Sequence, residues 1–192
     1  MTDALQKLFG SASRVKLLRL FLFNPAERLT VAEAALRAQV SEDVVRSEVS
    51  MLVGVGMLRR SRRGNVVRFG LNTAFPYYDS LQKLLLNVSG RGGEVRDRLR
   101  RTGNIKLVLI AGIFVGEWNA AIDLMVVGDR VNNTAFKKYL RSLESEIGKE
   151  IRYTLLSTKD FFYRFNMSDK LMRDTFDYPH QIVLDKLDIG LK

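Results

Sequence analysis

The sequence predicts an α+β protein in two parts: a mainly helical N-terminal part with a hairpin, and a small C-terminal α/β part. Three observations lead to this prediction. Apolar residues recur at helical spacing through residues 5–54. Two short arginine-rich runs flank the Gly64-Asn65 pair, and continuous β-branched apolar runs begin only after Asn104. We therefore expect three regions: a first domain over 1–73, a connecting helix and basic linker over 74–103, and a second domain over 104–192.

The first part begins with a predicted helix over residues 5–22, because its apolar side chains suit a broad buried face. The Asn24-Pro25 pair ends this helix. The short run "RLT" can form a strand, and Thr30 then stands before the helical pattern "VAEAALRAQV". Glu33 lies three residues after Thr30, so the two residues can form a capping box.

A third helix is predicted over "SEDVVRSEVSMLVGVG", capped by Ser41 and closed by glycines. Its apolar spacing turns Val45, Val49 and Leu52 toward the core. The following segment "MLRRSRRGNVVRFGLN" predicts a β-hairpin, because Gly64 and Asn65 suit a two-residue turn between short apolar-basic runs.

The order helix, short strand, helix, helix, hairpin is that of a winged helix-turn-helix domain. The segment resembles ArsR-like transcription regulators, whose second motif helix ends in a pattern matched here by Val45, Val49, Leu52, Gly56, Met57 and Leu58. The resemblance covers about residues 5–73. It implies binding to double-stranded DNA, with the helix after Ser41 in the major groove. It also implies a homodimer, because one short helix reads few base pairs.

Two groups of residues are expected to contact DNA. The exposed positions of the predicted recognition helix are Ser41, Val44, Arg46, Ser47 and Ser50. The hairpin adds Arg59, Arg60, Arg62, Arg63, Asn65 and Arg68. Arg46 suits a guanine, Val44 suits a thymine methyl, and the hairpin arginines suit phosphates or a minor groove. The alternative is that the arginine run is only a solvated surface.

The distribution of charge agrees with a polyanionic partner. The net charge is +10. Residues 1–73 hold 12 lysines and arginines against 6 aspartates and glutamates, whereas residues 105–192 hold 13 against 12. The excess therefore lies in the first half, as nucleic-acid binding would require. A basic surface that serves only solubility is the alternative.

Several functional classes are excluded by composition. The chain has no cysteine and one histidine, His180, so disulfides, thiol nucleophiles and histidine-rich metal sites are excluded. No apolar run approaches the roughly 20 residues that span a bilayer. The N-terminus lacks the layout of a signal peptide, and we expect a cytoplasmic protein.

The connecting region predicts two helices. The segment "YYDSLQKLLLN" has an apolar stripe that could pair with a second copy or pack within the monomer. The segment "EVRDRLRR" predicts a short basic helix, whose arginines could extend a DNA footprint.

The second domain predicts strands and helices in alternation. The runs "IKLVLIAGIF", "AIDLMVVGD" and "EIRYTLLS" suit strands, and "NTAFKKYLRSLESEIGK" suits an amphipathic helix. Thr158 can cap the helix "KDFFYRFNM", "DKLMRDTFDYP" suits a further short helix, and "QIVLDKL" completes the core.

This layout resembles the minimal nucleotidyltransferases over about residues 104–187. In active members a glycine-serine turn seats the nucleotide phosphates, and a D-x-D pair with a third carboxylate binds magnesium. Here Gly112 and Asp123 are present, but Ile113 replaces the serine and Ala121 replaces the first aspartate. The third strand has no carboxylate between residues 151 and 157. We therefore expect no transfer catalysis, no catalytic residue and no bound metal or cofactor.

Gly112 and Asp123 remain to be explained. They could serve packing alone, through a tight turn and hydrogen bonds to the backbone. Alternatively they could belong to a retained pocket that binds a nucleotide, with Phe114 and Trp118 stacking on the base. A third alternative is weak catalysis with magnesium completed by Glu117 or Asp129, two carboxylates close in sequence.

The sequence as a whole predicts a homodimeric transcription regulator. Its second domain would serve dimerisation, partner binding or the sensing of a nucleotide or small-molecule effector. Two other functions stay open: a nucleotidyltransferase that uses the first domain for targeting, and an antitoxin-type protein that masks a toxin and represses its own operon.

Overall fold

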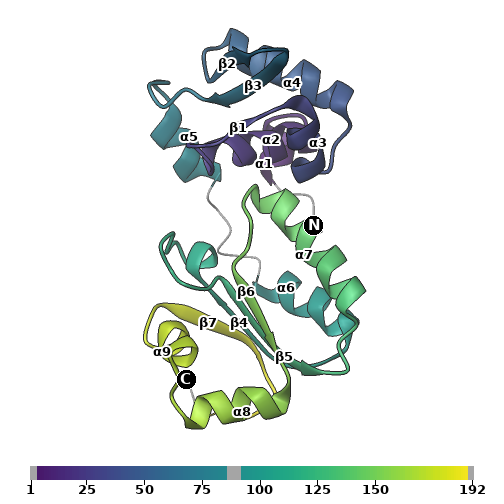
Figure 1. The fold of residues 1–192 in the computed structure, drawn as a ribbon, viewed down its shortest axis with the longest axis vertical. Helices are drawn as coiled ribbons and strands as arrows, with labels where there is room; N and C mark the ends of the chain where they lie inside the picture. The colour runs from purple at the N-terminus through teal and green to yellow at the C-terminus, as the bar shows by residue number, and fades with distance from the viewer. Residues whose placement is uncertain (1–3, 86–91, 190–192) are drawn as a thin grey trace. The chain divides into compact units, whose positions relative to one another are not determined.

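The computed structural model describes residues 4–85 and 92–189, and it has a mixed α+β fold with two small sheets (Figure 1). The chain forms two compact units. The first comprises Met1–Asn87 with Arg141–Glu150, and the second comprises Val88–Leu140 with Ile151–Lys192. This division differs from the predicted one, because the predicted connecting region is shared between the two units. Residues 86–91 of that region lie outside the described residues.

The first unit contains helices around a three-stranded sheet. Its elements are α1 (Ala4–Leu8), α2 (Ala12–Leu22), β1 (Arg28–Leu29), α3 (Val31–Ala38), α4 (Glu42–Gly54), β2 (Leu58–Arg63), β3 (Val66–Leu71) and α5 (Tyr78–Leu85). The strand order is β1-β3-β2, and both pairings are antiparallel. The predicted order helix, strand, helix, helix, hairpin is confirmed.

The first predicted helix is broken in two. Gly10 has a φ of +70°, in the left-handed region that favours glycine, and it separates α1 from α2. Ser11 then caps α2, since its hydroxyl accepts a hydrogen bond from the Arg14 backbone N–H at 3.2 Å. The apolar pattern continues across the break, which is why spacing alone predicts a single helix.

The first helix after β1 begins as predicted, whereas Ser41 stands at the N-cap position of α4 without a side-chain hydrogen bond to the helix. Thr30 and Glu33 form the capping box: the Thr30 N–H donates to the Glu33 carboxylate at 2.7 Å, and the Glu33 N–H donates to the Thr30 hydroxyl at 3.2 Å. Gln39 ends α3 with a φ of +52° and opens the tight turn to α4. The three predicted inward residues of α4 are buried: Val45, Val49 and Leu52.

The predicted hairpin is also confirmed. Arg63 pairs with Val66 across the Gly64-Asn65 turn, and Gly64 has a φ of +59°. On the other side of β3, Arg28 of β1 pairs with Gly70. A methyl group on Gly70 would lie 3.1 Å from the Glu27 carbonyl oxygen, so the absence of a side chain allows β1 to approach closely.

The second unit is built on a four-stranded mixed sheet. Its elements are α6 (Gly92–Leu99), β4 (Asn104–Ala111), β5 (Leu124–Asp129), the first turns of α7 (Asn133–Ile147), β6 (Tyr153–Leu156), α8 (Thr158–Asn166), α9 (Lys170–Phe176) and β7 (His180–Asp185). Short 3-10 turns follow α6 and β4, at Arg100–Thr102 and Gly112–Phe114. The strand order is β6-β5-β4-β7, with only β5 and β6 parallel.

Helices cover both faces of this sheet. Phe161 of α8 and Met172 of α9 pack in one buried cluster with Leu107, Leu109, Met125 and Val127 of the central strands. α6 lies on the opposite face, where Gly92 approaches Val183 and Ile110 so closely that a methyl group would lie 2.7 Å from Val183. β4 and β5 are therefore buried on both sides, as their continuous apolar runs predict.

The start of α8 differs from the prediction. Ser157, not Thr158, is the N-cap, and its hydroxyl accepts from the Asp160 backbone N–H at 3.1 Å. Thr158 is the first helical residue, and its hydroxyl instead donates to Asp129 at 2.7 Å. Serine and threonine can both cap a helix. Here the Thr158 hydroxyl is bound to Asp129, and Ser157 is the cap.

Candidate functional site

The exposed face of α4 contains all five predicted contact residues. These are Ser41, Val44, Arg46, Ser47 and Ser50. Arg46 is held by Glu42 one turn earlier, with 2.6 Å between the Nη2 and Oε2 atoms. Both side chains are about half exposed, at 61% and 48%, so the pair contributes only a few tenths of a kcal/mol. A stronger acceptor could therefore take the place of Glu42.

An ion pair between the nearly buried Glu48 and the partly exposed Arg14 holds α4 against α2. Glu48 accepts from Arg14 at 2.8 Å through Nε and at 3.2 Å through Nη2, and it is nearly buried. Glu48 lies three residues after Val45 and just before Val49, so helical spacing places it on the inward face of α4. Its partner Arg14 lies 34 residues earlier in the chain, so the spacing does not predict this ion pair.

The hairpin arginines lie on two faces of the sheet. Arg60 and Arg62 of β2 share one face, opposite Phe69 and Val67 of β3, whereas Arg59 and Arg63 point to the other face. These four arginines are exposed. Only at the tip, where Arg62 and Arg63 flank the turn with Gly64 and Asn65, can both faces meet one phosphate backbone.

Arg68 differs from the other hairpin arginines, because it braces the hairpin. Its guanidinium donates to the Arg28 carbonyl at 2.8 Å and to the two carboxylate oxygens of Glu33 at 2.9 and 3.3 Å. The sequence predicts a DNA contact for Arg68. In this conformation Arg68 instead links β3 to α3.

A groove runs between α4 and the hairpin and brings three predicted residues together. It encloses ≈ 350 Å³. Its lining consists of Val31, Arg46, Val49, Ser50, Val53, Arg60, Val67 and Phe69. Arg46 and Ser50 from α4 thus face the same space as Arg60 from β2. The lining thus combines four apolar residues, Val31, Val49, Val53 and Val67, and the ring of Phe69 with two arginines and a serine.

In the second unit, Asp123 is fully buried and its carboxylate is bound by Arg152. The guanidinium donates to Asp123 through Nε at 2.8 Å and through Nη2 at 2.7 Å. Backbone N–H groups of Arg152 and Ile113 complete the set, each at 2.9 Å. Both carboxylate oxygens therefore have two donors each. The carboxylate in turn raises the pKa of Arg152, first through the hydrogen bond and then through its charge.

Arg152 also fixes the loop between β4 and β5. Its Nη2 donates to the Trp118 carbonyl at 3.2 Å, and its Nη1 donates to the Ala120 carbonyl. One guanidinium thus joins the start of the third predicted strand to Asp123 and to the loop. It also places a positive charge directly beside the buried carboxylate of Asp123.

Gly112 is required by its contact with Asp123. It has a φ of +51°, and a methyl group there would lie 2.0 Å from Asp123 Oδ1 and 2.8 Å from the Ile122 carbonyl oxygen. The glycine leaves room for the carboxylate, and the next N–H, from Ile113, donates to it. This geometry supports the packing explanation of the Gly112–Asp123 pair.

The four predicted nucleotide-binding residues do not form an open pocket together. Gly112, Phe114 and Asp123 are buried, and Trp118 is half-buried. A neighbouring pocket of ≈ 330 Å³ is lined instead by Glu117, Asn119, Ala120, Ala121, Lys170, Asp174 and Tyr178. The ring of Phe114 is part of the core, so in this conformation it is not accessible to a base.

The two carboxylates proposed to complete a metal site lie apart from Asp123 or are already bound. Glu117 is exposed in the pocket just described. Asp129 accepts from the Thr158 N–H at 3.0 Å and forms an ion pair with Lys106 at 2.9 Å. Within residues 4–85 and 92–189, no three histidine, aspartate or glutamate side chains are grouped to hold a metal ion.

The contacts of Asp129 predict a pH-dependent contribution to stability. The Thr158 backbone N–H, followed by Lys106, lowers its pKa from 3.8 to about 2. Because the folded state holds the ionised form, the contribution is complete above pH 3.8 and is lost as the pH falls toward about 2. Asp129→Asn is expected to lower urea stability at pH 6 and to differ less from the parent protein near pH 2.5. Equal stability of the two proteins at pH 6 would contradict this assignment.

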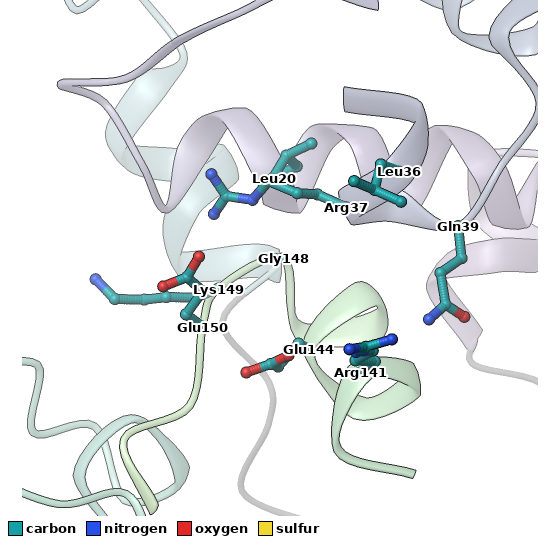
Figure 2. Close-up of a pocket in the computed structure, with 9 residues that line it drawn as sticks. All are labelled: Leu20, Leu36, Arg37, Gln39, Arg141, Glu144, Gly148, Lys149 and Glu150. Atoms are coloured by element: carbon teal, nitrogen blue, oxygen red, sulfur yellow. The ribbon is translucent and has the colours of Figure 1, made fainter. Parts of the chain in front are cut away.

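A further pocket lies in the first unit and is drawn in Figure 2. It encloses ≈ 490 Å³. It is lined by Leu20, Leu36, Arg37, Gln39, Arg141, Glu144, Gly148, Lys149 and Glu150. Gly148 allows the chain to pass against α2, where a methyl group would lie 2.5 Å from the Arg19 carbonyl carbon. Three cations and two carboxylates share the lining, so the pocket favours no single ligand charge.

No family model, curated protein or solved structure matches this chain. No helix among the described residues is both long enough and apolar enough to cross a bilayer.

Proposed function

We propose that this chain is a sequence-specific DNA-binding transcription regulator whose first unit is a winged helix-turn-helix domain. One observation carries the proposal: an exposed polar face of α4 lies beside an arginine-rich hairpin in the helix, strand, helix, helix, hairpin order. A helix of this kind enters the major groove, and a basic hairpin contacts the adjoining backbone.

The base contacts would come from the first turns of α4. Arg46 can donate two hydrogen bonds to a guanine, and its present partner Glu42 is exposed and easily displaced. Val44, 36% exposed, can contact a thymine methyl. Ser41, Ser47 and Ser50 suit phosphates or base edges.

The hairpin would contribute charge rather than sequence reading. Arg62 and Arg63 lie at its tip, and Arg59 and Arg60 lie nearer its base. Arginine binds phosphate with a planar pair of donors, and a narrow minor groove also attracts it. Arg68 would support these contacts from behind, through Glu33.

The second unit is proposed to be nucleotidyltransferase-like but without catalysis. Two of the three metal carboxylates of the active pattern are absent, and the remaining one, Asp123, is neutralised by Arg152. Such a unit would serve homodimerisation, partner binding or the sensing of a nucleotide or small-molecule effector. In the first unit, Tyr77 just before α5 and Leu84 on α5 are 65% and 45% exposed, and they offer a further surface for a second copy.

Specific DNA binding is tested by fluorescence anisotropy at near-physiological salt. We expect a duplex from upstream of the chain's own gene to bind about 10³-fold tighter than a shuffled duplex. Equal, weak binding to that duplex and to duplexes from neighbouring promoters would contradict a sequence-specific regulator.

Two variants separate charge from sequence reading. Arg62→Ala/Arg63→Ala is expected to weaken binding on every duplex and to reduce the salt slope by about 1 for each lost phosphate contact. Arg46→Ala is expected to cost roughly 1–3 kcal/mol on the preferred duplex only. An unchanged salt slope in the double variant would remove the hairpin from the interface.

The two competing functions make different predictions. An active nucleotidyltransferase would incorporate labelled nucleotide into a protein or small molecule, and Asp123→Asn would abolish the labelling. An antitoxin-type protein would co-purify with a toxin encoded by the neighbouring gene. Neither result is expected for a regulator of the proposed kind.

A further inference from the structure

We propose that the second unit carries its own binding surface for the phosphates of duplex DNA, formed by Arg96, Arg98, Arg100, Arg101 and Arg130. We call it the η1 surface, after the 3-10 turn Arg100–Thr102 at its centre. It rests on the proposed function only in the identity of the polyanion. Its residues belong to the second unit, which apart from Arg96–Arg101 is nearly neutral, and not to the proposed winged helix-turn-helix.

The arginines of the end of α6 and of the 3-10 turn lie around one carboxylate. Arg96 binds Asp97 at 2.9 Å, and its hydrogen bond is the main reason why the pKa of Asp97 is lowered. Arg100 and Arg101 follow Asp97 by three and four residues, the spacing at which side chains on a helix are neighbours, and their charges lower the same pKa further. One carboxylate therefore stands against three arginines.

Arg130 directly follows β5, and the chain at this point lies beside the 3-10 turn. Gly103 makes this possible: a methyl group there would lie 2.8 Å from Val131 Cα and 2.9 Å from the Arg130 carbonyl oxygen. The Asn132 N–H also donates to the Thr102 carbonyl at 2.8 Å. The 3-10 turn and the residues after β5 are thus in direct contact.

These cations are available to a ligand. Among the described residues, Arg98, Arg100, Arg101 and Arg130 form no ion pair, and all four are exposed. Arg130 also has a φ of +55°, a strained conformation for a residue other than glycine. By contrast, residues 153–189 hold five lysines and arginines against six aspartates. The net positive charge of the described part of the unit therefore lies within residues 92–140, where five of the eight lysines and arginines belong to this surface.

The chemistry of the surface favours a duplex backbone over other polyanions. The apolar residues of α6, Val95 and Leu99, are fully buried, so α6 has no apolar face to insert into a membrane. No large apolar or aromatic side chain within residues 92–138 is strongly exposed, and single strands need such side chains for stacking. What remains is a row of planar guanidinium donors, which bind phosphates without reading bases.

The test measures how the binding of the full chain to a shuffled duplex depends on salt concentration. The duplex has about 40 base pairs, so that it can contact several surfaces at once. Arg98→Ala/Arg100→Ala/Arg101→Ala is expected to reduce the slope of log K against log salt by about 2 to 3. The control is Lys159→Ala/Lys170→Ala/Lys186→Ala, which removes the same charge from exposed positions elsewhere in the unit and is expected to leave the slope within about 1 of the parent value.

A second variant excludes loss of folding as the cause. Arg130→Gly removes one charge and relieves the left-handed conformation, so it should not destabilise the unit. It is expected to reduce the slope by about 1. A parent slope in Arg130→Gly and in the triple arginine variant, or an equal loss in the lysine control, would overturn the η1 surface.

Comparison with Arg62→Ala/Arg63→Ala separates this inference from the proposed function. A loss in the hairpin variant alone would overturn the η1 surface and leave the winged helix-turn-helix in place. A loss in the η1 variants alone would support the surface and refute DNA contact by the hairpin. Additive losses would support both.

Discussion

Replacing Arg152 by alanine is expected to lower the free energy of unfolding of the second unit by about 3 kcal/mol. The reason is that Asp123 is fully buried and would lose its guanidinium partner, with only two backbone N–H donors left. The guanidinium side is 39% exposed, so we expect the low end of the range found for broken buried pairs. The loop carbonyls of Trp118 and Ala120 would also lose their donor.

Urea titration followed by Trp118 fluorescence measures this effect. Trp118 is the chain's single tryptophan and lies in the loop that Arg152 holds, so its signal reports the second unit. The matched control is Arg164→Ala, which breaks the more exposed Arg164–Asp169 pair and should cost at most about 1 kcal/mol. A similar small loss for Arg152→Ala would show that water solvates Asp123.

A double variant tests whether the pair is needed for stability or only for charge balance. Asp123→Leu/Arg152→Met replaces both charges with apolar side chains. We expect it to be more stable than Arg152→Ala alone, because no unpaired buried charge remains. If the double variant lost as much free energy of unfolding as Asp123→Leu and Arg152→Met lose together, the loss would be due to packing and the loop contacts instead.

Gly112→Ala is expected to have the other large effect, a loss of about 3 kcal/mol or more in the second unit. Two costs add. The φ of +51° is unfavourable for alanine by about 1 kcal/mol. The new methyl group would also lie 2.0 Å from Asp123 Oδ1, so the carboxylate would have to move away from Arg152 and the Ile113 N–H.

Gly116→Ala is the control for backbone strain. Gly116 lies in the same loop with a φ of +88°, but a methyl group there meets no heavy atom within 4 Å. It should cost only about 1 kcal/mol. If the two glycine variants were equally stable, the contact between Gly112 and Asp123 would not be the reason for the glycine.

Much of the fold could be predicted, because its signals are local. The capping box of Thr30 and Glu33, the turn at Gly64 and the inward face of α4 each depend on residues within one or two turns of one another. The break at Gly10 was missed because the apolar pattern continues through it. The N-cap of α8 was misplaced by one residue because Ser157 and Thr158 have equivalent side-chain chemistry.

The Asp123 site could be predicted only in part. The sequence shows that the carboxylates of an active site are missing, and it raises the packing explanation for Gly112. It does not show that Arg152 binds Asp123, since the two are 29 residues apart and meet through the parallel pairing of β5 with β6. Arg152 looks like an ordinary surface residue before a strand. The partner of Asp123 therefore cannot be identified from residue spacing.

Glu33 makes two contacts at once, and through them it links the hairpin to the start of α3. The same carboxylate receives the Thr30 N–H at the start of α3 and the guanidinium of Arg68 in β3. The Thr30 N–H, and after it the guanidinium of Arg68, keep the pKa of Glu33 below its usual value. The Glu33 carboxylate is therefore ionised at neutral pH. A hairpin that tilts to follow a DNA backbone must either move α3 with it or give up the hydrogen bonds of Arg68. In the proposed DNA complex, a displacement of the hairpin tip would thus be transmitted through α3 to the turn before α4.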